Sequence, residues 1–460
     1  MVFDQRRLRF CRSRPRVFVI TDIANEPDDT QSLVRLLLYG NEFDIRGIVA
    51  RTSTWLRTSV YPGEIERSIN AYAAVVPNLN THVHPENQYP AAEDLLGIIR
   101  QGPPVYGKRA LDPDIPLSDG SELLIEQLSC SSNDSLWVLC WGGTNVLAQA
   151  LQYLHKTQSV SAFTNLRSRL RVYAISDQDD TRLWIRTRYP DIFYICSVHA
   201  WNSYALATWT GISGDLQGPE FPDFGGPDTT KKIGPLGGVY PDTLYIMEGD
   251  TPTFLYLIQN GLGCAEHPEW GSWGGRYAPV DMGLAARHYS DTIDRVVGAD
   301  GRCYVSTRAT IWRWREAYQN DFAARMRWTV EGAAAANHAP VVVVNGDQGP
   351  EPLMIFAKAG ESFQYREPTA ALGLVTDPQV AVLEITSTED PGVPGGKARI
   401  TLPEPEHCAV RFGTGSQLAT GQTLHVILEV KDNGLPCLYS YKRMVIHVTS
   451  EQFLSEGQKP

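Results

Sequence analysis

The chain has 460 residues, of which 43% are hydrophobic and 20% are charged, and its formal net charge is −11. This balance is ordinary for a soluble globular protein, and the length predicts more than one domain. The mild negative charge excludes a typical nucleic-acid binder, which carries a basic surface, and the absence of a long apolar run excludes a membrane span.

The amino terminus, "MVFDQRRLRFCRSRPRVF", is charged and contains no apolar stretch of signal-peptide length. We therefore expect a cytoplasmic protein, or a secreted one if a leader is missing from this sequence.

Short apolar segments then alternate with helix-like segments through the first two thirds of the chain. The strand-like segments are residues 16–20, 45–50, 135–143, 170–176 and 191–196, and amphipathic segments such as "DTQSLVRLLLYG" and "TNVLAQALQYL" separate them. This alternation predicts a mostly parallel sheet flanked by helices. A further helix is predicted over "RHYSDTIDRV" (287–296). Because ligands bind beyond the carboxyl ends of the strands in such sheets, the residues after each strand are candidates for chemistry.

Polar and acidic residues follow these predicted strands. "TDIANEPDD" follows the first, and "RTSTW", "WGGTN" and "SDQDD" follow later ones; a fifth run, "LYIMEGDTP" (244–252), ends in the same way. One acidic cluster alone is usual at a helix amino terminus, where carboxylates complement the helix dipole. Several clusters at one edge of a sheet favour a shared cation instead.

Oxygen ligands at this edge suit a hard cation. Asp22, Asp28, Asp29 and Asp250 offer carboxylates, and Thr144 offers its main-chain carbonyl. Calcium accepts six to eight oxygen ligands in a forgiving geometry, whereas magnesium is stricter and zinc prefers His or Cys. We expect a Ca²⁺ site that activates a water, with Asp22 and Asp28 as catalytic residues and Asp22 as the general base.

Aromatic and polar residues near the predicted strand ends are candidates for substrate binding. Tryptophan faces bind sugar rings or stack on bases, although burial in the core is the alternative for each of them. A second carboxylate, from Glu26 or Glu248, would provide the pair that glycosidases use. The predicted substrate-binding residues are Asn25, Glu26, Trp55, Asn145, Asp177, Asp180, Trp201, Asn202, Glu248, Trp273 and Arg276, with His199 and His267 as candidate proton donors.

The pattern changes near Asn337. Short β-branched runs and Gly/Pro turns follow, including "LHVILEVKDNGLPCLYSYKRMVIHV" (424–448), and helical periodicity is absent. This pattern predicts an antiparallel β-sandwich of immunoglobulin-like or cadherin-like type. The predicted domains are therefore an α/β domain over residues 15–336 and a sandwich over residues 337–460.

Several blocks resemble a known family. "TDIANEPDD" resembles the aspartate-rich fingerprint of nucleoside hydrolases, and "WGGTNVLAQAL", "MEGDTPTFLYLIQNGL" and "ATIWRWREAYQNDFAARM" resemble its branch of cellulose-binding, nucleoside-hydrolase-like proteins. That branch joins such a domain to a carboxyl-terminal sandwich. The resemblance implies a calcium ion that holds a sugar diol and the attacking water. The residues that match the family's ligand positions are Asp22, Asp28, Asp29, Thr144 and Asp250.

The sequence also departs from the family pattern. Ile20 stands where the fingerprint has its leading Asp, and two extra residues separate Asp22 from Asp28. Ala24 occupies a position usually held by Gly, and Gly249 replaces the His that donates a proton to the leaving base. These departures argue against purine or pyrimidine nucleosides as substrates.

Three functions follow from these observations. The leading one is a calcium-dependent hydrolase of an N- or O-glycosidic bond in a ribosyl or other small glycoside. The alternatives are a carbohydrate-binding, cellulose-binding protein without turnover, and a pocket recruited for a non-hydrolytic reaction in secondary metabolism. The expected partner is a small glycoside or carbohydrate, with no nucleic acid and no membrane. Nucleoside hydrolases are commonly oligomers, but a sandwich could cover the same surface, so a homo-oligomer stays open.

Overall fold

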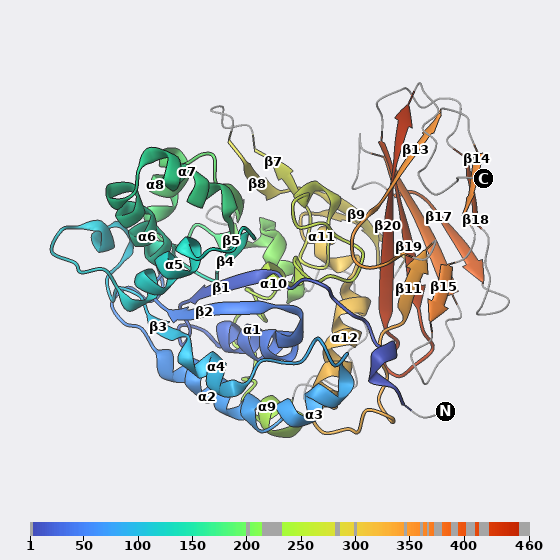
Figure 1. Cartoon of the computed structure of the whole chain (residues 1–460), viewed down its shortest axis with the longest axis horizontal. Helices are drawn as coiled ribbons and strands as arrows, with labels where there is room; N and C mark the ends of the chain where they lie inside the picture. The colour runs from blue at the N-terminus through green and yellow to red at the C-terminus, as the bar shows by residue number, and fades with distance from the viewer. Residues whose placement is uncertain are drawn as a thin grey trace.

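The computed structural model describes residues 3–198, 203–213, 232–280, 286–298, 301–344, 347–358, 362–365, 368–371, 380–387, 394–401, 410–413 and 423–449. Figure 1 shows an α/β domain built from the first two thirds of the chain and a strand-rich region built from the last third. Within these residues, no helix combines the length and the apolar composition that crossing a membrane requires.

An eight-stranded sheet forms the centre of the α/β domain, in the order β3-β2-β1-β4-β5-β6-β8-β7. Adjacent strands are parallel, except that β7 runs antiparallel to β8. The chain moves outward from β1 through β2 to β3, and then crosses back to place β4 on the other side of β1. The strands are β1 (Arg16–Thr21), β2 (Asp44–Ala50), β3 (Ile99–Gln101), β4 (Leu136–Cys140), β5 (Leu170–Ser176), β6 (Phe193–Ser197), β7 (Tyr277–Pro279) and β8 (His288–Asp291).

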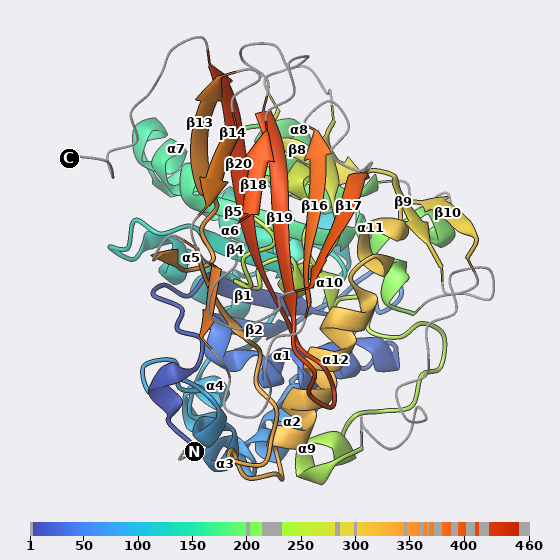
Figure 2. The ribbon, with the colours of Figure 1, turned by 90° about the vertical axis from the view of Figure 1, so that its right-hand side faces the viewer.

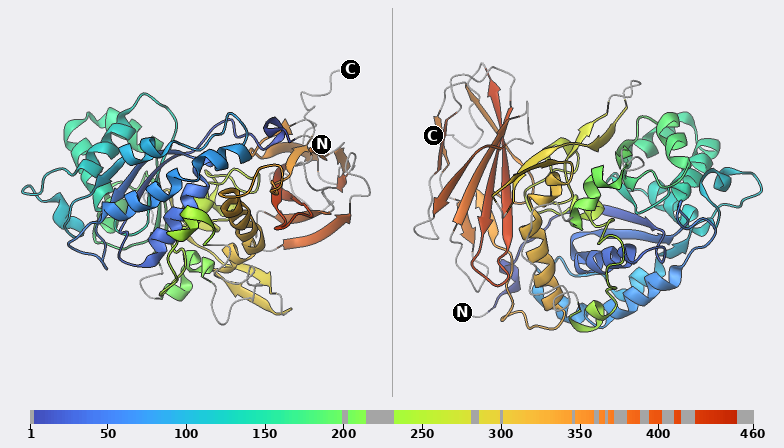
Figure 3. Two further views of the ribbon diagram at one scale, coloured as in Figure 1. Left: turned by 90° about the horizontal axis from the view of Figure 1, so that it is seen from below. Right: turned by 180° about the vertical axis from the view of Figure 1, so that it is seen from behind.

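Helices cover both faces of this sheet (Figure 3). Every residue of β1 is buried; Val17 and Val19 pack into one core cluster, and Phe18 and Ile20 pack into another on the opposite face. A strand buried on both faces reads as a continuous apolar run, which is why "RVFVI" shows no polar alternation. Helices α1 (Pro27–Leu38), α2 (Pro62–Ala73), α4 (Ala92–Gly97), α10 (Pro252–Leu255) and α12 (Arg315–Trp328) contribute to the first cluster, and α5 (Asp119–Ser129), α6 (Asn145–Thr157), α7 (Val160–Arg169) and α8 (Thr181–Arg188) to the second.

The predicted parallel sheet with flanking helices is confirmed, but two local predictions are wrong. Residues 244–250 form bends and turns, and no strand is present there; Leu244 and Tyr245 are largely exposed. The segment predicted as a helix at 287–296 contributes β8 and the start of β9 (Asp294–Val297), which pairs with β10 (Cys303–Ser306). In both cases a short apolar pattern is compatible with a strand and with a helix, and packing against distant residues determines which structure forms. The remaining described helices are α3 (Val76–Leu79), α9 (Gly234–Gly238) and α11 (Ala309–Trp312).

The strand-rich region contains three described sheets (Figure 2). The largest has the order β13-β20-β19-β16-β17, and its pairs are antiparallel except for β13 with β20. The prediction of an all-antiparallel arrangement is therefore wrong for that pair. The strands are β11 (Val341–Val344), β12 (Asp347–Gln348), β13 (Leu353–Lys358), β14 (Ser362–Tyr365), β15 (Pro368–Ala371), β16 (Val380–Ser387), β17 (Pro394–Thr401), β18 (Val410–Gly413), β19 (Thr423–Lys431) and β20 (Tyr439–Thr449).

The strand-rich region forms direct hydrogen bonds with the α/β domain. The β20 backbone donates from Tyr441 to Asn260 O at 2.9 Å and from Arg443 to Gly261 O at 3.0 Å. The Arg443 guanidinium also donates to the carbonyl of Leu262, at 2.6 Å. Residues of both regions belong to one continuous core cluster. Helix α12 ends at Trp328 and β11 begins at residue 341, and the predicted domain boundary at 336/337 falls in this connection.

Candidate functional site

The site lies where the strand order changes direction. Asp22 follows β1, and the segment "WGGT" (141–144) follows β4, which is the parallel neighbour of β1 on the side opposite β2. In open α/β sheets, loops that diverge beyond two such strands leave a crevice at their carboxyl ends. The fold therefore separates the loops above β1 and β4 and creates space for a ligand.

The loop between β1 and α1 is strained at one residue. Ala24 has a φ of 77°, the left-handed region that favours glycine, and the turn is closed by a hydrogen bond from Asn25 N to Asp22 O of 3.0 Å. Helix α1 then begins at Pro27, which is a favoured first residue. The loop thus fixes Asp22 on one side of the crevice and Asp28 and Asp29 in the first turn of α1.

Three buried carboxylates meet beneath the crevice. Asp28, Asp29 and Asp250 each place a carboxylate oxygen within 4.8 Å of the others. Both carboxylate oxygens of Asp250 are buried and have no hydrogen-bond partner among the described residues. Asp29 accepts a hydrogen bond from the Thr21 hydroxyl. A helix dipole alone needs no third carboxylate from a distant loop, so helix capping does not account for this cluster.

Burial and mutual repulsion raise the proton affinity of these groups. Burial, followed by the charges of Glu26 and Asp22, raises the pKa of Asp28 to about 7. Burial, followed by the neighbouring aspartates, raises the pKa values of Asp29 and Asp250 well above their ordinary value. The cluster therefore takes up protons or a cation at neutral pH, because three buried negative charges repel one another in a low dielectric.

These residues fit a divalent cation. Two oxygens on opposite sides of a calcium ion lie about 4.6–5.2 Å apart, since each Ca–O bond is about 2.3–2.6 Å long. The Asp28, Asp29 and Asp250 oxygens lie within 4.8 Å of one another, so they are close enough to coordinate one such ion together. The unsatisfied oxygens of Asp250 offer free lone pairs, and the donor set of oxygens alone suits calcium better than zinc.

A buried arginine stands beside Asp22. Arg51, directly after β2, is completely buried, and its Nη2 lies 3.6 Å from Asp22 Oδ1. A Cβ atom on Gly142 would overlap both of these side chains, and one on Gly143 would overlap Asp179. The glycines of "WGG" therefore provide the space for Arg51. Burial raises the pKa of Asp22, and the Arg51 charge opposes that shift. Asp22 is thus paired with a guanidinium, and its charge also acts on the three clustered carboxylates.

A pocket of about 240 Å³ opens above these groups. Its polar lining includes Asp22, Asn25, Glu26, Asp28 and Asp29, and its aromatic and apolar lining includes Trp55, Trp141, Ile175, Tyr204, Trp209, Tyr245 and Ile246, together with Gln178. The structure therefore brings together Asp22, Asn25, Glu26, Asp28, Asp29 and Trp55 of the predicted site residues at one pocket, with Asp250 buried in contact range of the aspartates below.

The absence of a histidine at position 249 has a steric reason. A Cβ on Gly249 would lie 2.8 Å from Asp28 Oδ2 and 3.0 Å from the Trp209 ring. Real Cβ atoms essentially never come as close as the 2.8 Å approach to Asp28, so this carboxylate would have to move, and the 3.0 Å approach to Trp209 is also tight.

Thr144 and Asn145 lie at the start of α6 and do not appear among the described pocket-lining residues. The Thr144 carbonyl accepts the first helical hydrogen bond from Ala148 at 2.9 Å, and its amide donates to Asp179 at 2.8 Å. Asn145 donates to Thr52 and to Val105, each at 2.9 Å. Both residues brace the loops around the pocket.

Three acidic residues that were predicted to bind substrate have protein partners in the structure and do not line the pocket. Asp177 forms a buried ion pair with Arg186, and Asp180 accepts a hydrogen bond from the Lys108 amide at 2.7 Å. Glu248 is 2.7 Å from Arg35 Nη1 and also accepts a hydrogen bond from the Tyr240 hydroxyl at 2.7 Å. Because α1 carries Arg35 and the two aspartates, the Glu248 ion pair ties the loop with Asp250 to the same helix.

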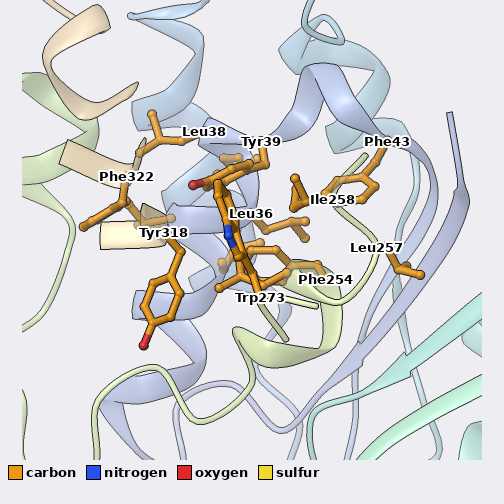
Figure 4. Close-up of a cluster of buried hydrophobic side chains, with 14 of the residues drawn as sticks. Leu36, Leu38, Tyr39, Phe43, Phe254, Leu257, Ile258, Trp273, Tyr318 and Phe322 are labelled. Atoms are coloured by element: carbon orange, nitrogen blue, oxygen red, sulfur yellow. The ribbon is translucent and has the colours of Figure 1, made fainter. Parts of the chain in front are cut away.

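Trp273 and Arg276, which were also predicted to bind substrate, are buried away from the residues that line the pocket. Figure 4 shows Trp273 beside Leu36 and Phe254 in the core, and its Nε1 donates to the Tyr441 hydroxyl at 3.3 Å. Arg276 is buried and donates to Asp294 at 2.8 Å. Both residues stabilise packing near the second region of the chain and are not among those that line the pocket.

Three predictions fall on residues outside the described ranges, namely Trp201, Asn202 and His199. His267, the other candidate proton donor, stacks on Trp270 with ring centroids 4.1 Å apart and pairs with Glu269. It is not among the residues that line the pocket.

Sequence reasoning missed several residues of the site. Arg51 follows a predicted strand directly, and this position is the only feature of the sequence that suggests a role for it in the site. Tyr204 and Trp209 lie in short 3₁₀ turns (Tyr204–Leu206 and Thr208–Ile212), for which no periodic pattern exists. Tyr245 and Ile246 belong to the apolar run that resembles a strand, and their role at the pocket depends on the loop that they form instead.

Comparisons with known proteins agree with this architecture. A family model described as cellulose-binding Sde182, nucleoside hydrolase-like domain, matches residues 16–277, which is more than half of the chain. A second, described as cellulose-binding protein Sde0182, C-terminal domain, matches residues 359–448. Among solved structures, the chain is similar to a nucleoside hydrolase-related hypothetical protein from Saccharophagus degradans that is associated with carbohydrate metabolism. The identity is 29% and the TM-score 0.77, over 95% of this chain and 100% of that one. A comparison with curated proteins finds no match.

Proposed function

This chain belongs to the family of cellulose-binding Sde182 proteins with a nucleoside hydrolase-like domain, and on that premise we propose that its pocket hydrolyses a glycosidic bond with the help of a divalent cation, calcium being the expected ion. The observation that carries the proposal is the cluster of Asp28, Asp29 and Asp250 beneath a pocket of about 240 Å³. The substrate class is a small glycoside, in which one sugar ring enters the pocket.

The cation would be held by Asp28, Asp29 and Asp250, whose oxygens meet the spacing that calcium requires. When bound, such an ion holds sugar hydroxyls and lowers the pKa of a coordinated water. The protein's own contribution is to keep these carboxylates converged. The ion pair between Arg35 and Glu248, at 2.7 Å, and the hydrogen bond from the Glu248 amide to Gln31, at 3.0 Å, fix the Asp250 loop against α1.

Two carboxyl groups at the pocket wall would move the protons. Asp22 accepts a proton from the water whose oxygen attacks the anomeric carbon. Glu26 donates a proton to the departing oxygen or nitrogen as the bond from that atom to the anomeric carbon breaks. Glu26 suits the acid role because burial, followed by the charge of Asp22, raises its pKa. Glu248 is excluded from this role by its ion pair with Arg35.

The test compares leaving groups. In the presence of calcium, Glu26→Gln should lower the release of sugar from alkyl glycosides strongly, but should barely affect nitrophenyl glycosides, whose leaving group needs no proton. Asp22→Asn should lower turnover of both substrate types, and Asp28→Ala should remove calcium binding and turnover together. Glu66→Gln, on the exposed face of α2, is the matched control. Unchanged turnover in Asp28→Ala, or full activity after treatment with EDTA, would refute a metal-dependent hydrolase.

A second function, carbohydrate binding without turnover, is supported by Arg51. A guanidinium 3.6 Å from Asp22 weakens the carboxylate as a base, because the positive charge favours its ionised form. In this case the pocket retains the cation and the sugar but breaks no bond. Calcium-dependent depletion of the protein by insoluble cellulose, with no reducing sugar released from any tested glycoside, would favour binding over hydrolysis.

A further inference from the structure

We propose that the ligand of this pocket is the end of a glycan chain, with its terminal sugar in the pocket and the following sugar units on an exposed aromatic rim. This inference rests on the proposed function, because it uses the same pocket, and it adds the substrate class and the residues that recognise it. The aromatic rim is formed by Trp55, Tyr204 and Tyr245, which come from three separate segments of the chain and all line the pocket.

The rim residues are unusually exposed for large aromatic side chains. Trp55 is 53% exposed, Tyr204 37% and Tyr245 73%, and the neighbouring Leu206 and Leu244 are 51% and 65% exposed. Single exposed apolar residues are ordinary on protein surfaces, but several that share one pocket mouth mark a binding surface. The exposed aromatic area of Trp55, Tyr204 and Tyr245 therefore belongs to the pocket, and Leu206 and Leu244 lie next to it in the sequence.

The backbone holds the turn that carries Trp55 in place before any ligand binds. The Ser53 hydroxyl accepts hydrogen bonds from the Trp55 and Leu56 amides at 3.1 and 3.2 Å. The neighbouring Thr54 amide donates to Gln178 O at 2.7 Å, which attaches this turn to the loop after β5. A turn fixed in this way loses little conformational freedom on binding, and this favours affinity at Trp55.

The rings leave open faces towards solvent. Trp55 and Tyr204 lie 6.4 Å apart with a tilt of 46°, so neither ring covers the flat face of the other. Tyr204 is supported from below by Trp209, with centroids 5.5 Å apart and an edge-on angle of 70°. Tryptophan and tyrosine combine a flat apolar surface with one polar group, which suits the CH-rich faces and the hydroxyl edges of sugar rings.

Pocket size explains why a chain end is favoured over a small isolated sugar or the middle of a chain. A volume of about 240 Å³ is below the range of about 300–1,000 Å³ that accommodates drug-sized ligands. The polar floor with Asp22, Asn25 and Asp28 therefore takes one sugar ring, and any second unit lies at the rim. A chain can place only its terminal unit in such a pocket while the next units remain outside.

The test measures affinity against chain length in the full-length protein with excess calcium. Glucose, cellobiose, cellotriose and cellotetraose serve as probes in isothermal titration calorimetry. Affinity should rise about tenfold from glucose to cellotriose, and Trp55→Ala or Tyr245→Ala should remove most of this rise, lowering the affinity for cellotriose far more than that for glucose. Tyr153→Ala is the matched control, because Tyr153 is 44% exposed on α6, and it should change nothing. Soluble glucans of different lengths, added at equal mass, should compete with cellotriose for the pocket in proportion to their number of chain ends.

Several results would overturn the proposal. Affinity that does not depend on chain length, or an equal loss for glucose and cellotetraose in Trp55→Ala, would remove the rim from sugar binding. Competition that follows total glucan mass would indicate binding along the chain instead of at its ends. If Trp55→Ala weakens adenosine but no oligosaccharide, the rim binds a base. Failure of the proposed function looks different: no probe then binds in a calcium-dependent way, in the wild type or in any rim variant.

Discussion

Replacing Asp250 by Asn should stabilise the cation-free protein, although most substitutions of buried residues destabilise. The wild-type protein must keep three carboxylates within 4.8 Å of one another, and at an effective dielectric constant of about 20 each ionised pair at that distance costs about 3 kcal/mol. Protonation of a carboxylate removes its charge and therefore limits this electrostatic repulsion. Holding a buried carboxyl protonated at pH 7, when its ordinary pKa is near 4, costs about 4 kcal/mol. We therefore expect Asp250→Asn to raise the free energy of unfolding by about 2–4 kcal/mol at pH 7 in EDTA.

The pH dependence has a defined sign. The pKa of Asp28 is raised to about 7 in the folded protein, so the folded state binds a proton that the unfolded state releases above about pH 4. The contribution of this group to stability is fully present below pH 4 and is lost as the pH rises to about 7. The advantage of Asp250→Asn in EDTA should therefore disappear near pH 4 and be largest near neutral pH.

The assay is urea unfolding of both proteins in EDTA and in excess calcium chloride. Calcium should stabilise the wild type by about 3 kcal/mol at a concentration one hundred times its dissociation constant, and should leave the variant unchanged. The matched control is Asp294→Asn. Asp294 is buried but paired with Arg276 at 2.7 Å and Arg313 at 3.0 Å, so its replacement should destabilise the protein by about 3–5 kcal/mol in both buffers. A destabilised Asp250→Asn in EDTA, or equal stabilisation of both proteins by calcium, would refute this reasoning.

Three further predictions concern groups around the site and one distant pair. Arg51→Met should raise calcium affinity about tenfold in calorimetry, because it removes a positive charge beside Asp22, while lowering the urea midpoint of the cation-free protein. Glu248→Gln should weaken calcium binding although Glu248 is not a proposed ligand, and a circular-dichroism thermal scan should show a lower midpoint. Burial lowers the pKa of His82 to about 4 and that of His338 to about 3, so both stay neutral when folded. Their contribution to stability should be complete above pH 6.5 and fall as the pH drops towards 4, and His82→Gln should reduce this acid-side loss in urea titrations.

The sequence predicted the part of the site that depends on local pattern. The apolar run of β1, the proline at the start of α1 and the acidic residues between them identify a strand, a loop and a helix in one stretch of chain. Parallel strands place their carboxyl ends at one edge, so the position of Asp28 and Asp29 beyond β1 followed from topology. Asp250 lies on a loop that no described strand directly precedes, so its meeting with these two residues follows from the family resemblance and not from the sheet.

The residues that sequence reasoning misplaced depend on packing between distant segments. Trp273 and Arg276 lie beside glycines, as pocket residues often do. Trp273 instead contacts Tyr441 of the strand-rich region, and Arg276 donates to the carbonyl of Ile293. No local sequence pattern predicts the burial of Arg51, because it depends on Gly142 and Gly143, which have no side chains and so leave room for the guanidinium. No period or motif in a single segment encodes a contact of this kind.

Charge balance connects the two proposed functions. Asp22, Asp28, Asp29 and Asp250 carry four negative charges when ionised, and Arg51 supplies one positive charge beside Asp22. A divalent cation among the other three carboxylates leaves one net negative charge over the whole group. A trivalent ion would cancel this remaining charge. Without any ion, three net negative charges would stay buried, and the raised pKa values of Asp29 and Asp250 show that burial and repulsion disfavour this state. The distance between Arg51 and Asp22 therefore decides whether that last charge accepts a proton from water or stays fixed in an ion pair, which is the difference between hydrolysing a sugar and holding it.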